Sequence, residues 1–241
     1  MAKRLFDVVV AALGLVVAAP LLVVAALGIR LSSRGPILHR ARLVGRDGRL
    51  FTMYKLRTMH LGAGSGSVIT AERDPRVFAF GRPLRRLKID ELPQLVNVLR
   101  GEMSLVGPRP QHPAIVQRHY APEHWETLRV RPGLASPGSL YDSTHGEPLV
   151  GSADPARAYV ERLLPIVLAL DLVYVRRASL RYDATVVART LGLIASSAVG
   201  RRTFPDPPEL SEAVHFLYPC RRDDGAGATS APGISDPRSS Q

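Results

Sequence analysis

The sequence predicts an α+β fold that is mainly helical, with a re-entrant N-terminal membrane helix, amphipathic interfacial helices and a small β-hairpin. Three observations lead to this prediction. An uncharged apolar run lies near the N-terminus, and two strand-like stretches flank a glycine-containing turn. Apolar residues also recur at helical spacing in residues 92–99, 113–130 and 154–176.

The apolar run covers the 22 residues from Val8 to Ile29. As a straight helix it would be about 33 Å long, which is enough to cross a bilayer. Pro20 lies near its middle, where proline removes a backbone hydrogen bond and bends a helix. Basic residues flank both ends of the run: Lys3 and Arg4 before it, and Arg30, Arg34, Arg40 and Arg42 after it.

The two basic flanks prefer the same side of the membrane, because positive residues tend to stay in the cytoplasm. A helix that enters the bilayer, breaks at Ala19 and Pro20 and returns satisfies this preference. A single-pass anchor would leave one basic flank outside. A cleaved signal peptide would need a shorter apolar core and a cleavage site of small residues, and residues 31–34 are a poor one.

Residues 37–59 are expected to form two short strands around the turn at residues 45–48. Lys55 and Arg57 are two residues apart and would point to the same side of the second strand. They could form a solvated edge or an anion-binding pair. Residues 62–67 are only glycine, alanine and serine, so we expect a mobile linker there.

Asp90 and Glu91 directly precede the helical pattern of residues 92–99. Pro93 falls in the first turn, where a helix tolerates proline, and Gly101 falls where a helix ends. The two carboxylates therefore lie at or just before a helix N-terminus, where exposed amides and the helix dipole favour anions. An ionised aspartate there is a usable nucleophile, although a simple capping role is the alternative.

Cations cluster around this carboxylate pair. Residues 82–88 contain three arginines and a lysine, which a pure capping role does not require. Arg109 lies between two prolines, and Arg131 begins a second rigid turn with proline and glycine. Such clustering suits a doubly charged phosphate group, which a carboxylate could not approach unaided.

The two later helical segments, residues 113–130 and 154–176, combine apolar spacing with arginines. Such helices could lie on an anionic membrane surface or simply face a core. From residue 201 onward proline, glycine, serine and charge dominate, which is typical of disorder. We therefore expect a membrane helix at 1–34, a globular domain at 35–200 and a largely disordered tail at 201–241.

The net charge of +11 and the pI near 10.6 indicate an anionic partner, namely nucleic acid, an acidic membrane or a phosphorylated substrate. We expect no nucleic acid, because few aromatics are present for base stacking and no recognition motif is found. A single cysteine, Cys220, excludes an intrachain disulfide and permits a cytoplasmic location. The seven histidines lack the spacing of a zinc site.

Taken together, these motifs resemble the bacterial sugar transferase family, the monotopic polyprenyl-phosphate phosphoglycosyl transferases. The similarity runs from about Lys3 to Leu193. Each motif alone is weak, but their order and spacing together are specific. They are the proline-broken apolar run and residues 48–51, 54–59, 74–77, 90–94, 97–110 and 131–133.

The resemblance implies an enzyme that moves a sugar-1-phosphate from a nucleotide diphosphate sugar, usually a UDP-sugar, to polyprenyl phosphate. This step would initiate exopolysaccharide or other surface glycan synthesis at the cytoplasmic face of the bacterial inner membrane, in contact with membrane lipid. A homo-oligomer is compatible with the sequence, which does not determine the oligomeric state.

The resemblance also implies residue roles. Asp90 would attack the sugar-linked phosphorus and form a covalent phosphosugar intermediate, and Glu91 would be its partner. A magnesium ion near Asp90 would neutralise the diphosphate. The cations expected to hold phosphate oxygens or the nucleotide are Lys55, Arg57, Arg85, Arg109 and Arg131.

Two hypotheses for other functional classes compete with the enzyme hypothesis. A non-catalytic basic scaffold on the membrane surface would explain the charge and the anchor but not the paired carboxylates among arginines. A membrane-tethered nucleic-acid binder would predict steeply salt-dependent binding to DNA. Substituting Asp90 separates the enzyme from the scaffold, because a scaffold would not respond.

Overall fold

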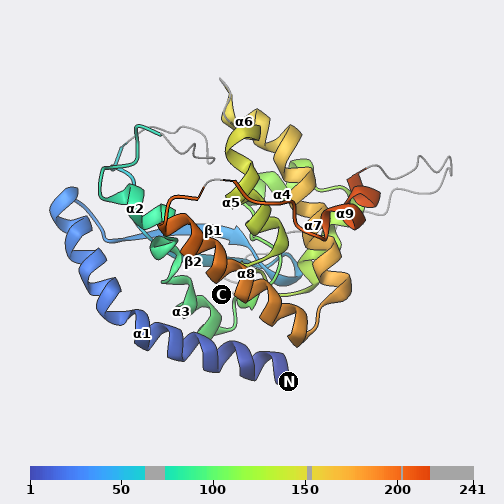
Figure 1. Cartoon of the computed structure of the whole chain (residues 1–241), viewed down its shortest axis with the longest axis horizontal. Helices are drawn as coiled ribbons and strands as arrows, with labels where there is room; N and C mark the ends of the chain where they lie inside the picture. Colours follow the sequence, from blue (N-terminus) through green and yellow to red (C-terminus); the bar gives the residue numbers. More distant parts are fainter. Residues whose placement is uncertain (63–73, 151–153, 202, 218–241) are drawn as a thin grey trace, which may run out of the picture.

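The computed structural model describes residues 1–62, 74–150, 154–201 and 203–217. A helical domain surrounds two small sheets, and a long N-terminal helix curves around one side of it (Figure 1). The helices are α1 (Ala2–Ser32), α2 (Gly81–Arg86), α3 (Gln94–Arg100), α4 (Pro113–His119), α5 (Pro137–Val150), α6 (Pro155–Ala158), α7 (Leu164–Arg177), α8 (Leu180–Ala198) and α9 (Leu210–Leu217). Short helical turns are η1 (Arg46–Gly48), η2 (Ile89–Glu91), η3 (Pro122–Arg129) and the π-helical η4 (Tyr159–Leu163). The predicted α+β, mainly helical fold is confirmed.

The predicted hairpin is also confirmed. β1 (Leu38–Val44) pairs antiparallel with β2 (Leu50–Leu56), with Leu38 opposite Leu56 and Val44 opposite Leu50. The connecting turn has Asp47 at φ 57° and Gly48 at φ 76°, conformations that glycine and aspartate tolerate better than most residues. β2 ends at Leu56, so Arg57 lies just beyond the strand.

A second, parallel pair joins β3 (Ser104–Val106) to β4 (Gly133–Ala135). The strands have three residues each, which is too short for an alternating pattern to reveal them in the sequence. Gly107 and Gly133 make the approach feasible, because a Cβ atom on either glycine would overlap the backbone of the other turn. The pairing brings the two rigid basic turns, residues 108–110 and 131–133, side by side.

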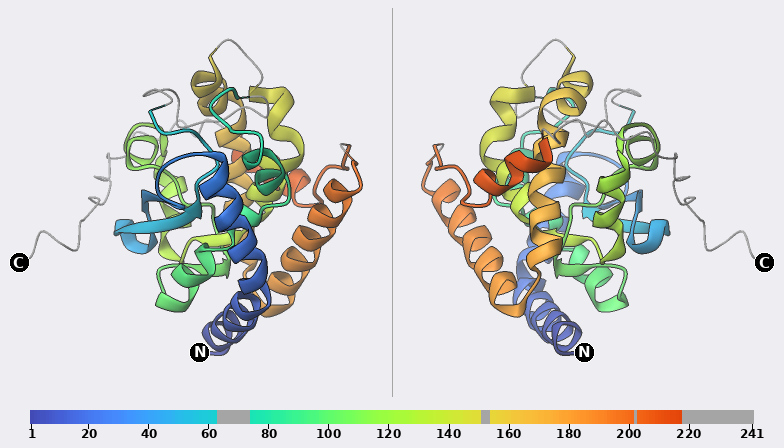
Figure 2. Two further views of the ribbon diagram at one scale, coloured as in Figure 1. Left: turned by 90° about the vertical axis from the view of Figure 1, so that its left-hand side faces the viewer. Right: turned by 90° about the vertical axis from the view of Figure 1, so that its right-hand side faces the viewer.

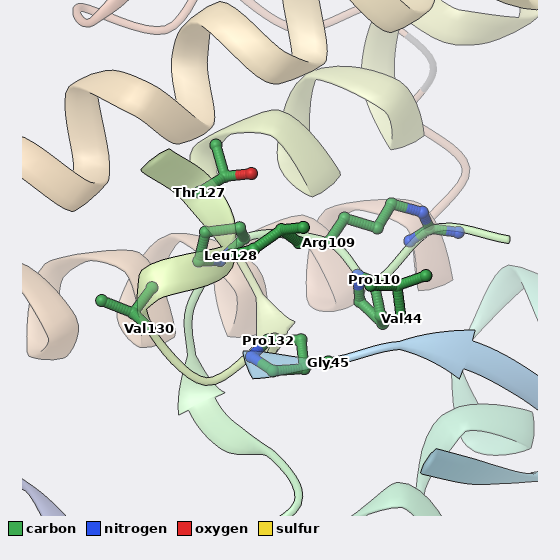
Figure 3. Close-up of a pocket in the computed structure, with 9 residues that line it drawn as sticks. Val44, Gly45, Arg109, Pro110, Thr127, Leu128, Val130 and Pro132 are labelled. Atoms are coloured by element: carbon green, nitrogen blue, oxygen red, sulfur yellow. The ribbon is translucent and has the colours of Figure 1, made fainter. Parts of the chain in front are cut away.

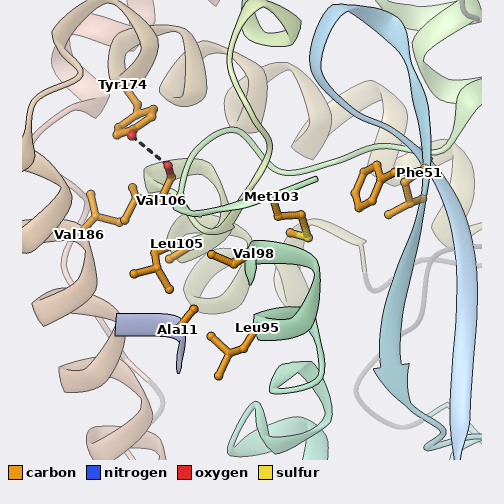
Figure 4. Packing of buried hydrophobic residues seen from close by; sticks show 11 residues of the cluster. Ala11, Phe51, Leu95, Val98, Met103, Leu105, Val106, Tyr174 and Val186 are labelled. Carbon is orange, nitrogen blue, oxygen red and sulfur yellow. Dashed lines mark hydrogen bonds between the residues drawn. The ribbon is translucent and has the colours of Figure 1, made fainter. Parts of the chain in front are cut away.

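The core lies where α1, α3, β3 and α8 meet α7 (Figure 4). Val98 and Met103 are fully buried there, and the Tyr174 hydroxyl donates a 3.0 Å hydrogen bond to the Val106 carbonyl. α7 is buried over most of its length, from Leu164 to Tyr174. This helix therefore faces a core, and the alternative that residues 154–176 lie on a membrane surface is wrong for α7.

The first turns of α1 are fixed to the globular domain. Arg4 donates hydrogen bonds to the carbonyls of Val98 (2.6 Å) and Leu99 (2.9 Å) at the end of α3. Asp7 is buried and accepts a hydrogen bond from the Ser104 hydroxyl, at 2.9 Å. The Arg4 contacts satisfy carbonyl groups that the C-terminus of α3 leaves without partners, and the Asp7 contact fixes α1 to β3.

The last turns of α1 return to the same domain. Ala25 and Ile29 are buried against Leu56, Phe78 and Leu84. The helix is therefore attached near both ends, and it curves between them (Figures 1 and 2). Helical structure is continuous through Pro20, so the break predicted at Ala19 and Pro20 is a bend inside one helix.

The outward side of α1 is a continuous apolar stripe. Of its most apolar 18-residue window only 17% is buried, which distinguishes it from the core helix of a soluble protein. By length and composition α1 could cross a membrane. The exposed apolar side chains are Leu5, Val9, Leu13, Val16, Val17, Leu21, Val23, Val24, Leu27 and Leu31.

Part of the predicted disordered tail is ordered. Residues 210–217 form α9, which packs against α7 with Ala213 fully buried. The apolar spacing of this helix is short and lies among prolines and charges, which are typical of disorder. The spaced residues are Leu210, Ala213, Val214 and Leu217. Residues 218–241 lie outside the described part of the chain, as does most of the linker predicted at residues 62–67.

Candidate active site

Asp90 and Glu91 lie on η2, a single helical turn that leads into α3. Lys88 precedes them in the left-handed conformation, with φ 54°. α3 has Pro93 at its N-cap, and no side chain caps it. Asp90 therefore lies just before the helix, as predicted, but the capping alternative is wrong.

Asp90 is 2% exposed and lies beside Lys55 of β2. The Lys55 ammonium is 3.0 Å from Asp90 Oδ2 and 3.5 Å from Glu91 Oε1, so one cation faces both carboxylates. Among the described residues no group makes a hydrogen bond of good geometry to Asp90 Oδ2. The Lys55 ammonium therefore compensates the charge of this buried carboxylate oxygen.

The two carboxyls titrate differently. Burial raises the pKa of Asp90; Lys55 lowers it in part, and the charge of Glu91 raises it further. Burial also raises the pKa of Glu91, but Lys88, Lys55 and Arg109 outweigh this effect and lower it to about 2. Glu91 is therefore ionised at neutral pH, and Asp90 is the carboxyl whose charge state depends on the cations around it.

Two predicted arginines act on this pair. The positive charge of Arg85 on α2 lowers the pKa of Asp90. Arg109, one-third exposed, interacts electrostatically with Glu91, and its Nε lies 3.8 Å from Asp142 Oδ2 on α5. The structure thus brings Lys55, Arg85 and Arg109 together around the carboxylates.

Asp171, which the sequence analysis missed, holds Arg109 in place. Its Oδ2 accepts a 2.8 Å hydrogen bond from the Arg109 backbone amide, and its Oδ1 accepts one of 3.1 Å from the amide of Gly138. A Cβ atom at position 138 would overlap that carboxylate. Burial raises the pKa of Asp171 to about 6, and the hydrogen bonds offset this only in part. A lone charge inside the apolar run of α7 was the available sequence signal.

Arg57 and Arg131 lie elsewhere. Arg57 is buried, and its guanidinium donates hydrogen bonds to the carbonyls of Pro36 (2.6 Å) and Ser33 (2.7 Å), just after α1. Arg131 donates a 2.8 Å hydrogen bond to the carbonyl of Gly101 at the end of α3. Their phosphate-binding roles stay predictions; in the structure Arg57 binds backbone carbonyls and the Ser33 hydroxyl, and Arg131 binds a backbone carbonyl.

A small hollow lies beside the turn that carries Arg109. It is formed by the end of β1, this turn and η3 (Figure 3). Neither Asp90 nor Glu91 lines it. Its walls are largely apolar, so it does not extend the charged site. The residues that line the hollow are Val44, Gly45, Pro108, Arg109, Pro110, Thr127, Leu128, Val130 and Pro132.

The carboxylate pair has the donor chemistry of a magnesium site. Mg²⁺ prefers oxygen ligands and is commonly bound by one or two carboxylates together with substrate phosphates. Asp90 Oδ2 lacks a hydrogen-bond partner in the described chain, and Glu91 adjoins it. No group of three or more acidic, histidine or cysteine side chains able to hold a metal occurs in the described ranges. The pair therefore fits a cation that shares its coordination with substrate, and does not form a complete protein cage.

Comparison with known proteins identifies the family. The family model for bacterial sugar transferases matches residues 1–197. The chain belongs to the bacterial sugar transferase family. It is 42% identical over 193 residues to the UDP-glucose:undecaprenyl-phosphate glucose-1-phosphate transferase of Caulobacter vibrioides, covering 78% of this chain and 68% of that one.

Two further relatives differ in length. The undecaprenyl-phosphate glucose phosphotransferase of Komagataeibacter xylinus is 39% identical over 78% of this chain, which spans only 35% of that protein. The exopolysaccharide production protein PSS of Rhizobium leguminosarum bv. phaseoli is 34% identical over 78% of this chain and 92% of its own length. The predicted family is confirmed. The predicted enzyme type, an undecaprenyl-phosphate sugar phosphotransferase, is confirmed as well.

Proposed function

We propose that this bacterial sugar transferase moves a sugar-1-phosphate from a UDP-sugar to polyprenyl phosphate, as the first step of exopolysaccharide or other surface glycan synthesis. The observation that supports this most directly is the buried Asp90, whose Oδ2 faces the Lys55 ammonium at 3.0 Å and whose charge is also favoured by Arg85. The names of the relatives supply the UDP-sugar and the undecaprenyl phosphate.

In the proposed first step an Asp90 oxygen attacks the phosphorus that carries the sugar. The bond from that phosphorus to the bridging oxygen breaks, and the nucleoside monophosphate leaves with the electron pair. In the second step an oxygen of polyprenyl phosphate attacks the same phosphorus, and the bond to Asp90 breaks. The aspartate is thereby regenerated, and the product is a polyprenyl diphosphate sugar.

Lys55 and Glu91 prepare the nucleophile. Lys55 favours the ionised form of the buried Asp90, because its charge opposes the effect of burial on the pKa of that carboxyl. Glu91 contacts the same ammonium at 3.5 Å. With a pKa lowered to about 2, Glu91 is a poor proton acceptor at neutral pH, so we assign it to holding the cations and not to general-base catalysis.

Arg85 and Arg109 would bind the phosphate oxygens, with the planar guanidinium geometry that suits such groups. Asp90, with Glu91 beside it, would hold the magnesium ion. When bound there, the ion would neutralise diphosphate charge and improve the leaving group.

We further propose that α1 is re-entrant and keeps both of its ends on the cytoplasmic side of the inner membrane. Its two ends contact one domain, and its outward stripe is apolar throughout. α8 begins beside the start of α1, where Lys3 lies 2.6 Å from Asp183, and it exposes Leu180 and Leu191. We therefore assign the predicted interfacial role to α8 in place of α7.

The covalent intermediate provides the test. Purified enzyme is incubated with magnesium and single nucleotide sugars from a panel, without polyprenyl phosphate, and the intact protein is weighed by mass spectrometry. We expect an added sugar-phosphate mass and an equivalent of nucleoside monophosphate with the cognate donor. Asp90→Asn should gain no mass. An adduct that persists on Asp90→Asn would refute the assignment, and full turnover in excess chelator would refute the metal.

A further inference from the structure

A segment beyond the family match contacts the helices that hold Arg109. The match ends at residue 197, near the end of α8. Figure 1 shows the chain leaving α8 and crossing over the domain to reach α9 beside α7. Within this part of the chain, residues 203–217, here called the C-terminal clamp, contact α5, α7 and α8.

The first contact of the clamp is with α5. Asp206 Oδ1 lies 3.4 Å from His145 Nε2, and His145 stacks on Tyr141 with ring centroids 4.6 Å apart. Asp142 lies on the same helical turn and faces Arg109, with 3.8 Å between Asp142 Oδ2 and Arg109 Nε. One turn of α5 therefore contacts the clamp through His145 and faces Arg109 with Asp142.

The second contact is with α8. Glu209 is 5% exposed, and its Oε1 accepts hydrogen bonds from Tyr182 (2.8 Å) and Arg189 (2.6 Å). Its Oε2 has no hydrogen-bond partner in the described residues. A buried carboxylate is costly without its donors, so the clamp is held where Glu209 can reach Tyr182 and Arg189.

The third contact is with α7. Ala213 is fully buried in the cluster formed with Leu163 and Val167, and Glu212 pairs with Arg177 at 2.6 Å. α7 carries Asp171, whose carboxylate accepts the amide hydrogen bond of Arg109. The clamp thus packs on the element that fixes the Arg109 backbone.

We propose that the C-terminal clamp is a positioning element of the active site, which holds α5 and α7 so that Arg109 is presented to the nucleotide sugar. This inference rests on the proposed function, since it takes Arg109 to bind the donor phosphates. The clamp does not touch Asp90, so it should affect donor binding more than the chemical step.

The experiment compares Asp206→Asn and Glu209→Gln with the wild type in the full-length enzyme. Asp47→Asn is the matched control, because Asp47 is an exposed, ion-paired aspartate on the hairpin turn, far along the chain from the clamp. Hydrogen–deuterium exchange is measured for peptides covering residues 106–112 and 138–146. These include the Arg109 and Gly138 amides that bind Asp171. Donor kinetics are measured in parallel.

For Asp206→Asn we expect faster exchange in both peptides and a KM for the donor raised about two- to fivefold, because a largely exposed polar contact contributes little. Its kcat should stay within about twofold, because the interaction lost affects ground-state binding. Glu209→Gln should raise KM about tenfold or more, since the contact is buried. Asp206→Glu retains the carboxylate and should keep the wild-type exchange and KM. Asp47→Asn should change neither quantity.

Unchanged exchange in both peptides for both clamp variants would overturn the proposal, as would a fall in kcat at constant KM. The exchange measurement needs no substrate. If the enzyme turned over no nucleotide sugar, the proposed function would fail. The exchange data would still decide whether the clamp orders α5 and the turn that carries Arg109.

Discussion

The Lys55 ammonium lies 3.0 Å from Asp90 Oδ2, inside a site where the aspartate is 2% exposed. Within the described part of the chain, this lysine is the cation that pairs with the proposed nucleophile, and it also contacts Glu91. An incoming diphosphate would compete for the same ammonium. Lys55 thus favours the ionised form of Asp90 against the effect of burial, and in the proposed mechanism the same ammonium would also meet the substrate phosphates.

Asp90→Asn should lower turnover by at least about 10³-fold, because an amide cannot act as a carboxylate nucleophile. Folding and membrane association should be retained, since Asp90 caps no helix and the partly exposed Lys55 keeps Glu91 as its partner. Release of nucleoside monophosphate, the melting temperature and the membrane fraction check this. Substantial turnover by the variant would remove Asp90 from the mechanism, and Glu91→Gln should impair transfer severely as well.

Lys55→Ala should lower kcat/KM by about 10²-fold or more, because a charge that stabilises the ionised site is lost. It should also move the acid limb of the pH–rate profile upward. Lys55 lowers the pKa of Asp90, so without it the nucleophile loses its proton only at higher pH. Lys55→Arg retains the charge and should keep the limb near its wild-type position. An acid limb unmoved by Lys55→Ala would show that it does not report Asp90.

Much of the site was predictable from the sequence because it is local. Asp90, Glu91 and the arginines upstream are close in the chain, and the glycine turn fixes the hairpin that carries Lys55. What failed depends on tertiary contacts. Arg57 follows Lys55 by two residues, but β2 ends at Leu56 and the arginine turns to the carbonyls after α1.

The missed residues share a physical reason. Asp171 is separated by 62 residues from the amide that it binds, so no local spacing could connect them. α9 is a single short helix whose apolar spacing has meaning only because α7 offers it a buried face. The π-helical turn at residues 159–163 likewise has no sequence signature.

Asp171→Asn should flatten the pH dependence of stability between about pH 4 and pH 6. The pKa of Asp171 is raised to about 6 in the folded chain from 3.8, so over this range the unfolded chain holds fewer protons. Stability from this group therefore falls as pH rises, by up to about 3 kcal/mol for two pKa units. Denaturant unfolding at several pH values checks this, and parallel curves for wild type and variant would contradict it.

The same variant should lower kcat/KM about tenfold or more. Both carboxylate oxygens of Asp171 accept backbone amides, and an asparagine offers only one acceptor, so either Arg109 or Gly138 loses its partner. Donor kinetics at pH 7 provide the measurement. Wild-type kinetics would show that the hydrogen bond does not position the arginine.

Arg57→Ala should lower the free energy of unfolding by about 2–4 kcal/mol, because a buried guanidinium donates to three carbonyls and to the Ser33 hydroxyl. Arg49→Ala, at an exposed position of the hairpin, is the control and should change stability little. Denaturant unfolding in detergent is the measurement. A raised donor KM with unchanged stability would instead support the phosphate-binding role.

Both ends of α1 should be cytoplasmic, because both contact the same domain and Pro20 bends the helix between them. Cysteines at Ala2 and Ser32 in a Cys220→Ala background report the topology. Ser32 is preferable to Ser33, whose hydroxyl binds Arg57. A membrane-impermeant reagent applied outside intact cells should label neither position, and both should be labelled after lysis.

Pro20→Ala tests what turns the chain back. Without the bend, a straight helix of 31 residues would extend about 46 Å, and its last turns could not reach Leu56, Phe78 and Leu84 while Arg4 stays on α3. We therefore expect lower transferase activity and a shift of the Ser32→Cys label toward the exterior. Wild-type activity together with two cytoplasmic labels would mean that packing against the domain bends α1 even without the proline.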